Sequence, residues 1–323
     1  MACMLHFTDP AGRQGAGAPA AAGASLSSLP MPDSSAQANG ACDTAVPGPG
    51  TVWFVGAGPG DPDLITVKGR SLVERAGAIL FAGSLVDETA TRWAPPGCTI
   101  ADSKSMTLDQ MAAWLVLQAQ KHRTVVRLQT GDPALYGALV ELVQPLDAAG
   151  VPVRVVPGVS SAMASAAAAV ESFTLPEVTQ TVVFTRVEGR TPMPPGESLA
   201  ELARHRCTLC IFLSITLLHK VQAGLREAGW PDDAPLLVVH KASWPGEERI
   251  VRCTVADVRE RCREAQVVSQ AMIIASPTLG ARHWPELAKS KLYDPGFTHR
   301  FRRAADVSAA APQAATNTPD SQR

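Results

Sequence analysis

The chain has 323 residues, which at about 150 residues per domain predicts about two domains and a sizeable core. The residues AVILMFWYC make up 46% of it and charged residues 18%, a composition too apolar for a chain that is disordered throughout. Lys and Arg total 29 against 30 Asp and Glu, and a formal net charge of -1 provides no global field to attract nucleic acid. We therefore expect a globular protein without a nucleic-acid partner, in which a local basic pocket is still compatible with the composition.

The two ends of the chain differ in composition from its middle. Residues 1–50 are rich in Ala, Gly, Ser and Pro without periodicity, and residues 304–323 are similar, so both are predicted to be disordered, with Met31 as an alternative start. No apolar run approaches the roughly 20 residues of a membrane span, and the first residues do not follow a secretory signal pattern. Seven scattered cysteines predict reduced thiols in a cytoplasmic protein rather than a disulfide framework.

Residues 51–175 alternate short apolar runs with helical patterns. Strands are expected at 51–57, 78–82, 124–128 and 152–156, and helices at 64–75, 108–121 and 136–149. A run of small residues at 162–170 predicts one more helix, which would pack closely. This alternation is typical of an α/β domain whose sheet is largely parallel and buried on both faces.

Residues 176–303 predict a second α/β domain. Strands are expected at 181–186, 208–214, 235–242, 249–255 and 270–276, and helices at 198–205, 217–228 and 255–264. The turn signal WPGEE at 244–248 separates two of these strands and predicts at least one antiparallel hairpin. The segment TLPEVTQ resembles a linker, so the domain boundary is expected around residues 172–179.

Glycine-bearing loops follow three strands of the first half, at residues 56–62, 130–137 and 157–162. Ligands bind beyond the carboxyl ends of parallel strands, and glycine allows the backbone to approach a ligand closely. Each loop alone is also explained by a tight turn or a helix cap. Pro59 and Pro62 remove backbone donors, and no acidic residue follows the second strand, so a dinucleotide site is disfavoured. Together the loops predict a small-molecule site with Asp132 as an acceptor, unless that carboxylate only caps the next helix.

Other candidate residues give weaker signals. Arg186 and Arg190 either grip an anionic ligand or lie in a solvated loop. Cys207 and Cys210 lie three apart in an expected strand, so they point to opposite faces, and no second Cys/His pair has zinc-ligand spacing. The isolated His219 and His240 are interpreted as surface or edge residues. We therefore predict no metal site and identify no catalytic side chain.

The loops, taken together, resemble those of a known family. Residues 56–62 followed by 64–69 resemble the opening of the tetrapyrrole methylases, the S-adenosylmethionine enzymes of corrin and siroheme synthesis. Residues 130–137 and 157–162 resemble their second and third loops, in order and at family spacing, over about 51–303. The resemblance implies a homodimer in which each chain has two α/β domains of the tetrapyrrole methylase type, 51–175 and 176–303, with the cofactor cleft between them.

Four further motifs resemble the group of this family that methylates C11 of precorrin-4 or cobalt-precorrin-4 in cobalamin (vitamin B12) biosynthesis. They are Phe81–Val86, Glu188–Pro192, Ala242–Pro245 and Ser290–Asp294. Residues 131–137 are closer to the cobalt-substrate branch. The alternatives are a methylase of uroporphyrinogen III, precorrin-2 or precorrin-3, a diphthine-synthase or rRNA-methylase relative, a non-enzymatic binder, and a Rossmann oxidoreductase. Near-neutral charge and the EGRTP loop disfavour a macromolecular substrate.

The resemblance also implies site residues. Contacts to S-adenosylmethionine, or to its product S-adenosylhomocysteine, are expected from Pro59, Thr130, Gly131, Asp132, Leu135, Ser160, Ser161, Leu213 and Ala242. Contacts to the acidic tetrapyrrole are expected from Gly58, Gly60, Asp61, Arg186, Arg190 and Lys241. Some relatives have Met in place of Leu213 and Ala in place of Ser161. A sulfonium methyl is already electrophilic, so the implied catalysis rests on holding the two reactants in a near-attack geometry.

Overall fold

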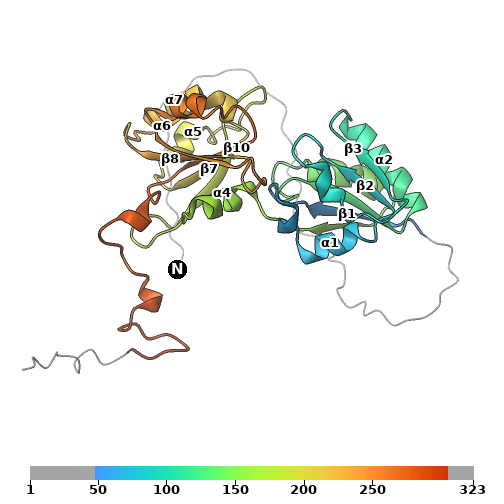
Figure 1. Cartoon of the computed structure of the whole chain (residues 1–323), viewed down its shortest axis with the longest axis horizontal. Coiled ribbons are helices and arrows are strands. Elements are labelled where there is room, and N and C mark those ends of the chain that lie inside the picture. Colours follow the sequence, from blue (N-terminus) through green and yellow to red (C-terminus); the bar gives the residue numbers. More distant parts are fainter. Residues whose placement is uncertain (1–47, 305–323) are drawn as a thin grey trace, which may run out of the picture. The chain divides into compact units, whose positions relative to one another are not determined.

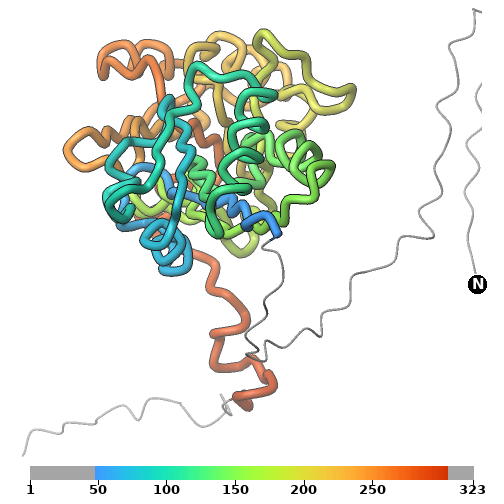
Figure 2. The backbone as a smooth tube through the Cα atoms, turned by 90° about the vertical axis from the view of Figure 1, so that its right-hand side faces the viewer, coloured from blue at the N-terminus to red at the C-terminus, as the bar shows by residue number. Residues whose placement is uncertain are grey.

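The structure is a computed structural model that describes residues 48–304, and the predictions for residues 1–47 and 305–323, including the start at Met31, lie outside the described residues. The described residues form two five-stranded sheets (Figure 1). Figure 2 follows the same backbone as a tube, and the described segment after the second sheet, residues 276–304, contains the 3-10 turns Ala281–His283 and Lys291–Tyr293.

The first sheet is entirely parallel and has the order β3-β2-β4-β1-β5. Its strands are β1 (Thr51–Gly56), β2 (Ala78–Phe81), β3 (Thr99–Asp102), β4 (Thr124–Gln129) and β5 (Val153–Val156). The four predicted strands and their parallel arrangement are confirmed, whereas β3 was not predicted. The central strand β1 pairs with β4 and β5, so Gly56 ends next to both neighbours.

Helices cover both faces of this sheet. α1 (Val67–Val73) packs on one face through Leu72 and Val73, against Val55 and Ile79. α2 (Leu108–Lys121) and α3 (Leu139–Ala148) pack on the other face, against the opposite set of strand residues. Burial on both faces explains why the strands are near-continuous apolar runs without alternation.

The second sheet is mixed and has the order β6-β7-β10-β8-β9. Its strands are β6 (Val182–Arg186), β7 (Thr208–Phe212), β8 (Pro235–His240), β9 (Arg249–Thr254) and β10 (Ala271–Ala275). Only the β6–β7 pair is parallel. The predicted hairpin is confirmed as the β8–β9 pair, and the WPGEE turn lies between these strands.

Helices also lie on both faces of the second sheet (Figure 1). α5 (Leu199–Ala203), α6 (Leu218–Glu227) and α7 (Val258–Glu264) share one core with the sheet, and α4 (Ser161–Ala169) packs on the opposite face. Cys207 belongs to the first of these cores and Cys210 to the second, so the predicted opposite orientation of the two thiols is confirmed.

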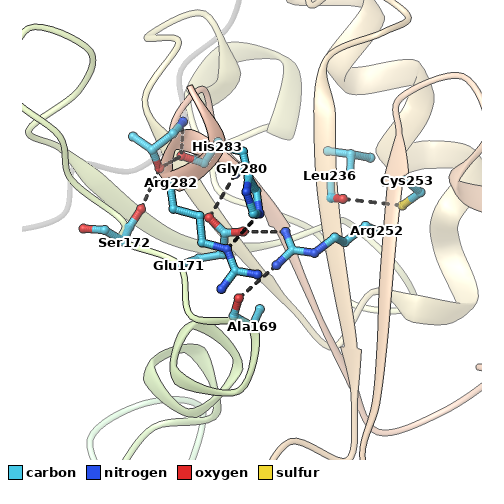
Figure 3. Close-up of polar contacts among 11 residues, drawn as sticks. Ala169, Glu171, Ser172, Leu236, Arg252, Cys253, Gly280, Arg282 and His283 are labelled. Atoms are coloured by element: carbon cyan, nitrogen blue, oxygen red, sulfur yellow. Dashed lines mark hydrogen bonds and ion pairs between the residues drawn. The ribbon is translucent and has the colours of Figure 1, made fainter. Parts of the chain in front are cut away.

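Polar contacts fix the end of α4 against the second sheet (Figure 3). The Arg252 guanidinium of β9 donates from Nη2 to the Ala169 carbonyl oxygen at 2.9 Å and forms an ion pair with Glu171. The Glu171 side chain is 3% exposed, and its Oε2 accepts a hydrogen bond from the Gly280 N–H at 3.0 Å. α4 thus packs on the second sheet although it precedes residue 175, and the boundary between 175 and 176 stays a prediction.

Candidate functional site

The three glycine loops meet through their backbones at the carboxyl ends of β1, β4 and β5. A Cβ placed on Gly56 would lie 2.5 Å from both the Gly131 carbonyl oxygen and the Gly158 Cα. A Cβ on Gly158 would overlap the same Gly131 oxygen. The Gly131 N–H donates to the Gly58 carbonyl oxygen at 2.8 Å. These glycines are therefore required for the contacts between loops, before any ligand is considered.

Asp132 links the second loop to the third. Its Oδ1 accepts a hydrogen bond from the Ala134 N–H at 2.8 Å, and its Oδ2 accepts one from the Gly158 N–H at 2.9 Å. Each carboxylate oxygen can accept a further hydrogen bond. The carboxylate therefore holds two loops together and keeps acceptor capacity for a ligand.

The third loop leads directly into α4. Ser160 is the N-cap residue, and its Oγ accepts a hydrogen bond from the Ala162 N–H at 3.3 Å. The Ser161 carbonyl oxygen accepts from Ser165 Oγ at 2.7 Å. The predicted helix cap is confirmed, and it places both serines at the start of a helix whose far end is fixed by Glu171 and Arg252.

The second sheet contributes the ends of β7 and β8 and the start of β10. Because β10 runs antiparallel to both neighbours, its first residues lie beside their last ones, and Ala271 pairs with His240. Leu213, Lys241 and Gln270 all have left-handed backbones, with φ of 52°, 46° and 45°. Such conformations are strained for side chains other than Gly, and they gather at ligand sites.

One cavity of about 970 Å³, including its opening to solvent, lies where these loops meet. All nine residues predicted to contact the cofactor line it, and so does Lys241. The lining residues that were not predicted are Leu85, Tyr136, Phe212, Ile215, Val239, Trp244, Gln270, Ala271 and Met272. Leu85, Tyr136 and Trp244 lie in motifs that the sequence already singled out.

Of the six residues predicted to contact the tetrapyrrole, Lys241 lines the cavity and the other five do not. Gly58, Gly60 and Asp61 flank the lining residue Pro59 but do not line the cavity themselves. The Asp61 carboxylate accepts a hydrogen bond from the Asp63 N–H at 2.8 Å and caps the 3-10 turn Pro62–Leu64.

The three predicted cations also differ in their surroundings. The Arg186 guanidinium donates to the carbonyl oxygens of Thr191 and Pro192, at 3.2 and 2.8 Å, and so stabilises its own loop. Arg190 is exposed in that loop and does not line the cavity. Lys241 lies in the cavity wall and pairs with Glu247.

Three aromatic rings pack together next to the cavity, and two of them, those of Tyr136 and Phe212, line it. The Tyr136 and Phe212 rings lie 5.4 Å apart, and the Phe212 and Phe184 rings 5.6 Å apart. Burial raises the pKa of the Tyr136 phenol, the charge of Glu197 adds to this increase, and Arg186 opposes it. The phenol therefore stays protonated and is available as a hydrogen-bond donor.

The unpredicted strand β3 supports the loop that carries Leu85. Asp102 Oδ1 at the end of β3 accepts from the N–H groups of Gly83 and Lys104, each at 2.9 Å. Burial alone would raise the pKa of Asp102, but these hydrogen bonds and the Lys104 ammonium outweigh it and lower the pKa. The adjacent Arg127 is 5% exposed and donates to Ser103 Oγ at 2.8 Å, and its burial lowers its pKa to about 10.

Between residues 48 and 304, no three side chains of His, Cys, Asp or Glu are grouped so that they could hold a metal ion. No helix within that same range has both the length and the apolar character that a membrane crossing requires.

The sequence profile of the family described as Tetrapyrrole (Corrin/Porphyrin) Methylases matches residues 51–259. The chain belongs to the tetrapyrrole methylase family. The predicted family is thus confirmed, and the matched range includes the three glycine loops and the β8–β9 hairpin.

Relatives within the tetrapyrrole methylases are similar over most of their length. The chain is 45% identical over 252 residues to the cobalt-precorrin-4 C(11)-methyltransferase of Priestia megaterium, a match that covers 78% of this chain and 97% of the relative. It is 42% identical over 232 residues to the precorrin-4 C(11)-methyltransferase of Mycobacterium tuberculosis, covering 72% and 92%.

Solved structures of the family show the same fold. The X-ray structure of a cobalt precorrin-4 methyltransferase superimposes with a TM-score of 0.67 at 46% identity, covering 70% of this chain and 94% of that one. The uroporphyrin-III C-methyl transferase of Thermus thermophilus, complexed with S-adenyl homocysteine, superimposes with a TM-score of 0.61 at 31% identity, covering 72% and 94%.

Proposed function

We propose that this tetrapyrrole methylase transfers the methyl group of S-adenosylmethionine to C11 of precorrin-4, with the cobalt-bearing form as the favoured substrate, in cobalamin biosynthesis. The observation that carries the proposal is the gathering of all nine predicted cofactor residues around one cavity. The names of relatives at 45% and 42% identity support the substrate and the position of methylation.

The residues present suit a nucleoside thioether. The wall combines apolar side chains, such as Leu135, Ile215 and Met272, with the polar loop residues Thr130 and Asp132. In our proposal the loops hold the polar parts of the cofactor, and the apolar wall holds the rest.

When bound, S-adenosylmethionine supplies an electrophilic sulfonium methyl group. The contribution of this chain is then to align the macrocycle carbon with that methyl and to exclude water. The backbone contacts between Gly56, Gly131 and Gly158 provide the rigidity that such alignment needs. Lys241 provides a cation at the wall for a carboxylate of the tetrapyrrole, and Arg186 stiffens the loop that carries Arg190.

We extend the proposal to the state of the protein in the cell. The enzyme works as a homodimer in the cytoplasm. The described cysteines, at positions 98, 207, 210, 253 and 262, are free thiols, which is compatible with a reducing compartment.

The first test is calorimetric titration with S-adenosylhomocysteine, beside NADH. One site per chain for the thioether and none for NADH supports the proposal, and well-folded protein that does not bind the thioether refutes it. Turnover is then measured with precorrin-4, with and without cobalt, and with uroporphyrinogen III. The product mass gives the number of methyl groups added, and the NMR position of the new methyl separates C11 from other carbons.

A further inference from the structure

The turn of the β8–β9 hairpin is hydrogen-bonded to the first glycine loop, more than 180 residues away in the chain. The Asp61 N–H donates to Ser243 Oγ at 3.1 Å. The Trp244 indole Nε1–H donates to the Pro59 carbonyl oxygen at 3.0 Å. These two hydrogen bonds bracket Gly60 on both sides.

Gly60 fits directly against the Trp244 ring. A Cβ on Gly60 would overlap the indole and lie 2.5 Å from its Nε1. The backbone of Gly60 is not in the left-handed region, so this position requires glycine for space and not for conformation. Gly60 thus contacts a tryptophan from the hairpin of the second sheet, and its expected contact with the tetrapyrrole stays a prediction.

A cation also contacts the indole. The Lys241 ammonium lies 4.8 Å from the centre of the Trp244 ring, and Glu247 pairs with that ammonium. The backbone N–H of Trp244 donates to the Lys241 carbonyl oxygen at 2.9 Å and so stabilises the turn that carries the indole. Pro59, Lys241 and Trp244 all line the cavity, so the indole is at once part of its wall and the contact that holds the loop.

We propose that Trp244 is a positioning residue that holds the segment Pro59–Asp61 at the edge of the cavity and thereby sets where the tetrapyrrole meets the cofactor. This inference rests on the proposed function. Trp244 acts through its indole N–H and through its fit against Gly60. Loss of either contact lets the loop move, with a larger effect on use of the tetrapyrrole than on cofactor affinity.

The first experiment is amide hydrogen exchange on the ligand-free protein, so that it does not depend on activity. Trp244→Ala is expected to raise exchange at least tenfold in the peptide covering residues 58–66. Trp244→Phe, which keeps a ring but loses the N–H, is expected to give a smaller increase. Trp114→Ala is the matched control, since Trp114 is a half-buried indole of α2 that packs on the other face of the first sheet and does not line the cavity. Unchanged exchange in Trp244→Ala overturns the proposal.

The second experiment is a double-mutant cycle that measures kcat/KM for the tetrapyrrole and the Kd of S-adenosylhomocysteine. Gly60→Ala is expected to lower kcat/KM at least tenfold in the presence of Trp244 but less than twofold in the Trp244→Ala background, where the clash is gone. The Kd is expected to rise by a smaller factor than kcat/KM falls, because Pro59 and Trp244 also line the cavity. Equal costs of Gly60→Ala in both backgrounds, or equal losses in Kd and kcat/KM, overturn the proposal.

Gly48→Ala is the glycine control, because an added Cβ there meets nothing within 4 Å. If the wild-type protein methylates another tetrapyrrole, the cycle is run with that substrate. If it methylates none, the proposed function fails, and the exchange experiment still decides whether the tryptophan holds the loop.

Discussion

Asp132 gives the sharpest test of how the glycine loops bind a cofactor. Its carboxylate accepts one hydrogen bond from the loop that contains it and one from the N–H of Gly158 in the third loop. Asp132→Ala removes both hydrogen bonds, and with them any direct contact of the carboxylate with the ligand. We expect the variant to fold and to bind S-adenosylhomocysteine 10- to 100-fold more weakly.

The magnitude follows from the two hydrogen bonds. A hydrogen bond to a charged group contributes about 1.5–3 kcal/mol net. Asp132 is half-buried, so the lower value applies, and two bonds give about 3 kcal/mol. At about 1.4 kcal/mol per tenfold change in Kd, complete loss of loop order corresponds to about 100-fold, and partial loss to about tenfold.

Calorimetric titration measures the Kd, and urea unfolding at the same pH measures the free energy of unfolding. Asp147→Ala is the matched control, because it removes an exposed carboxylate of α3 outside the cavity. Gly158→Ala disturbs the same junction by overlap with Gly131 while the carboxylate stays. If the two loops act as a unit, the losses from Asp132→Ala and Gly158→Ala do not add. A Kd of Asp132→Ala within twofold of the wild-type value refutes this reasoning.

Three further predictions concern stability and backbone contacts. Burial raises the pKa of Cys210 and Cys253 to about 12, whereas the unfolded chain ionises these thiols near their ordinary 9.0; stability therefore falls as the pH rises above 9, by about 1.4 kcal/mol per thiol at pH 10. The free energy of unfolding, measured with urea at pH 8 and pH 10, should show this loss. Cys210→Ala should make the difference between the two pH values smaller by about 1.4 kcal/mol, the contribution of one thiol. An unchanged difference in the variant would show that the Cys210 thiol does not contribute. Arg252→Leu leaves the buried Glu171 carboxylate with only the Gly280 N–H, so we expect a loss of roughly 1–3 kcal/mol, while an effect below 0.5 kcal/mol would mean that solvent replaces the ion pair. Leu213 is exposed with a φ of 52°, so Leu213→Gly should relieve about 1 kcal/mol of backbone strain and keep the Kd of S-adenosylhomocysteine within about threefold, whereas a tenfold rise would show that the side chain contacts the ligand.

Most strands of the first sheet could be predicted because their burial is visible in short segments of the sequence. β1 and β4 are buried on both faces, which leaves continuous apolar runs in the sequence. The helix expected at 136–149 begins only at Leu139, because Tyr136 and Ala138 have left-handed backbones that no local pattern announces. β3 was missed because it is a four-residue edge strand with exposed or half-buried side chains, and such a strand has no apolar run.

The candidate site also has one part that could be predicted from the sequence and one part that could not. The parallel side is made of loops whose glycines and Asp132 could be recognised in order along the chain. On the other side, Gln270, Ala271 and Met272 reach the cavity only because β10 runs antiparallel between β7 and β8. Strand direction depends on the pairing of distant segments, so no sequence pattern around residue 270 indicates a ligand wall.

The contact between Gly60 and the Trp244 ring connects a glycine loop of the first sheet with the hairpin of the second sheet. In the sequence the first glycine loop and the hairpin motif lie far apart, and Gly60 is expected to contact a ligand. The structure shows that the glycine makes room for the tryptophan, so the two positions constrain each other directly. A small residue next to a ligand site can therefore report on a partner side chain from another element, and substitutions at either position should be interpreted as a pair.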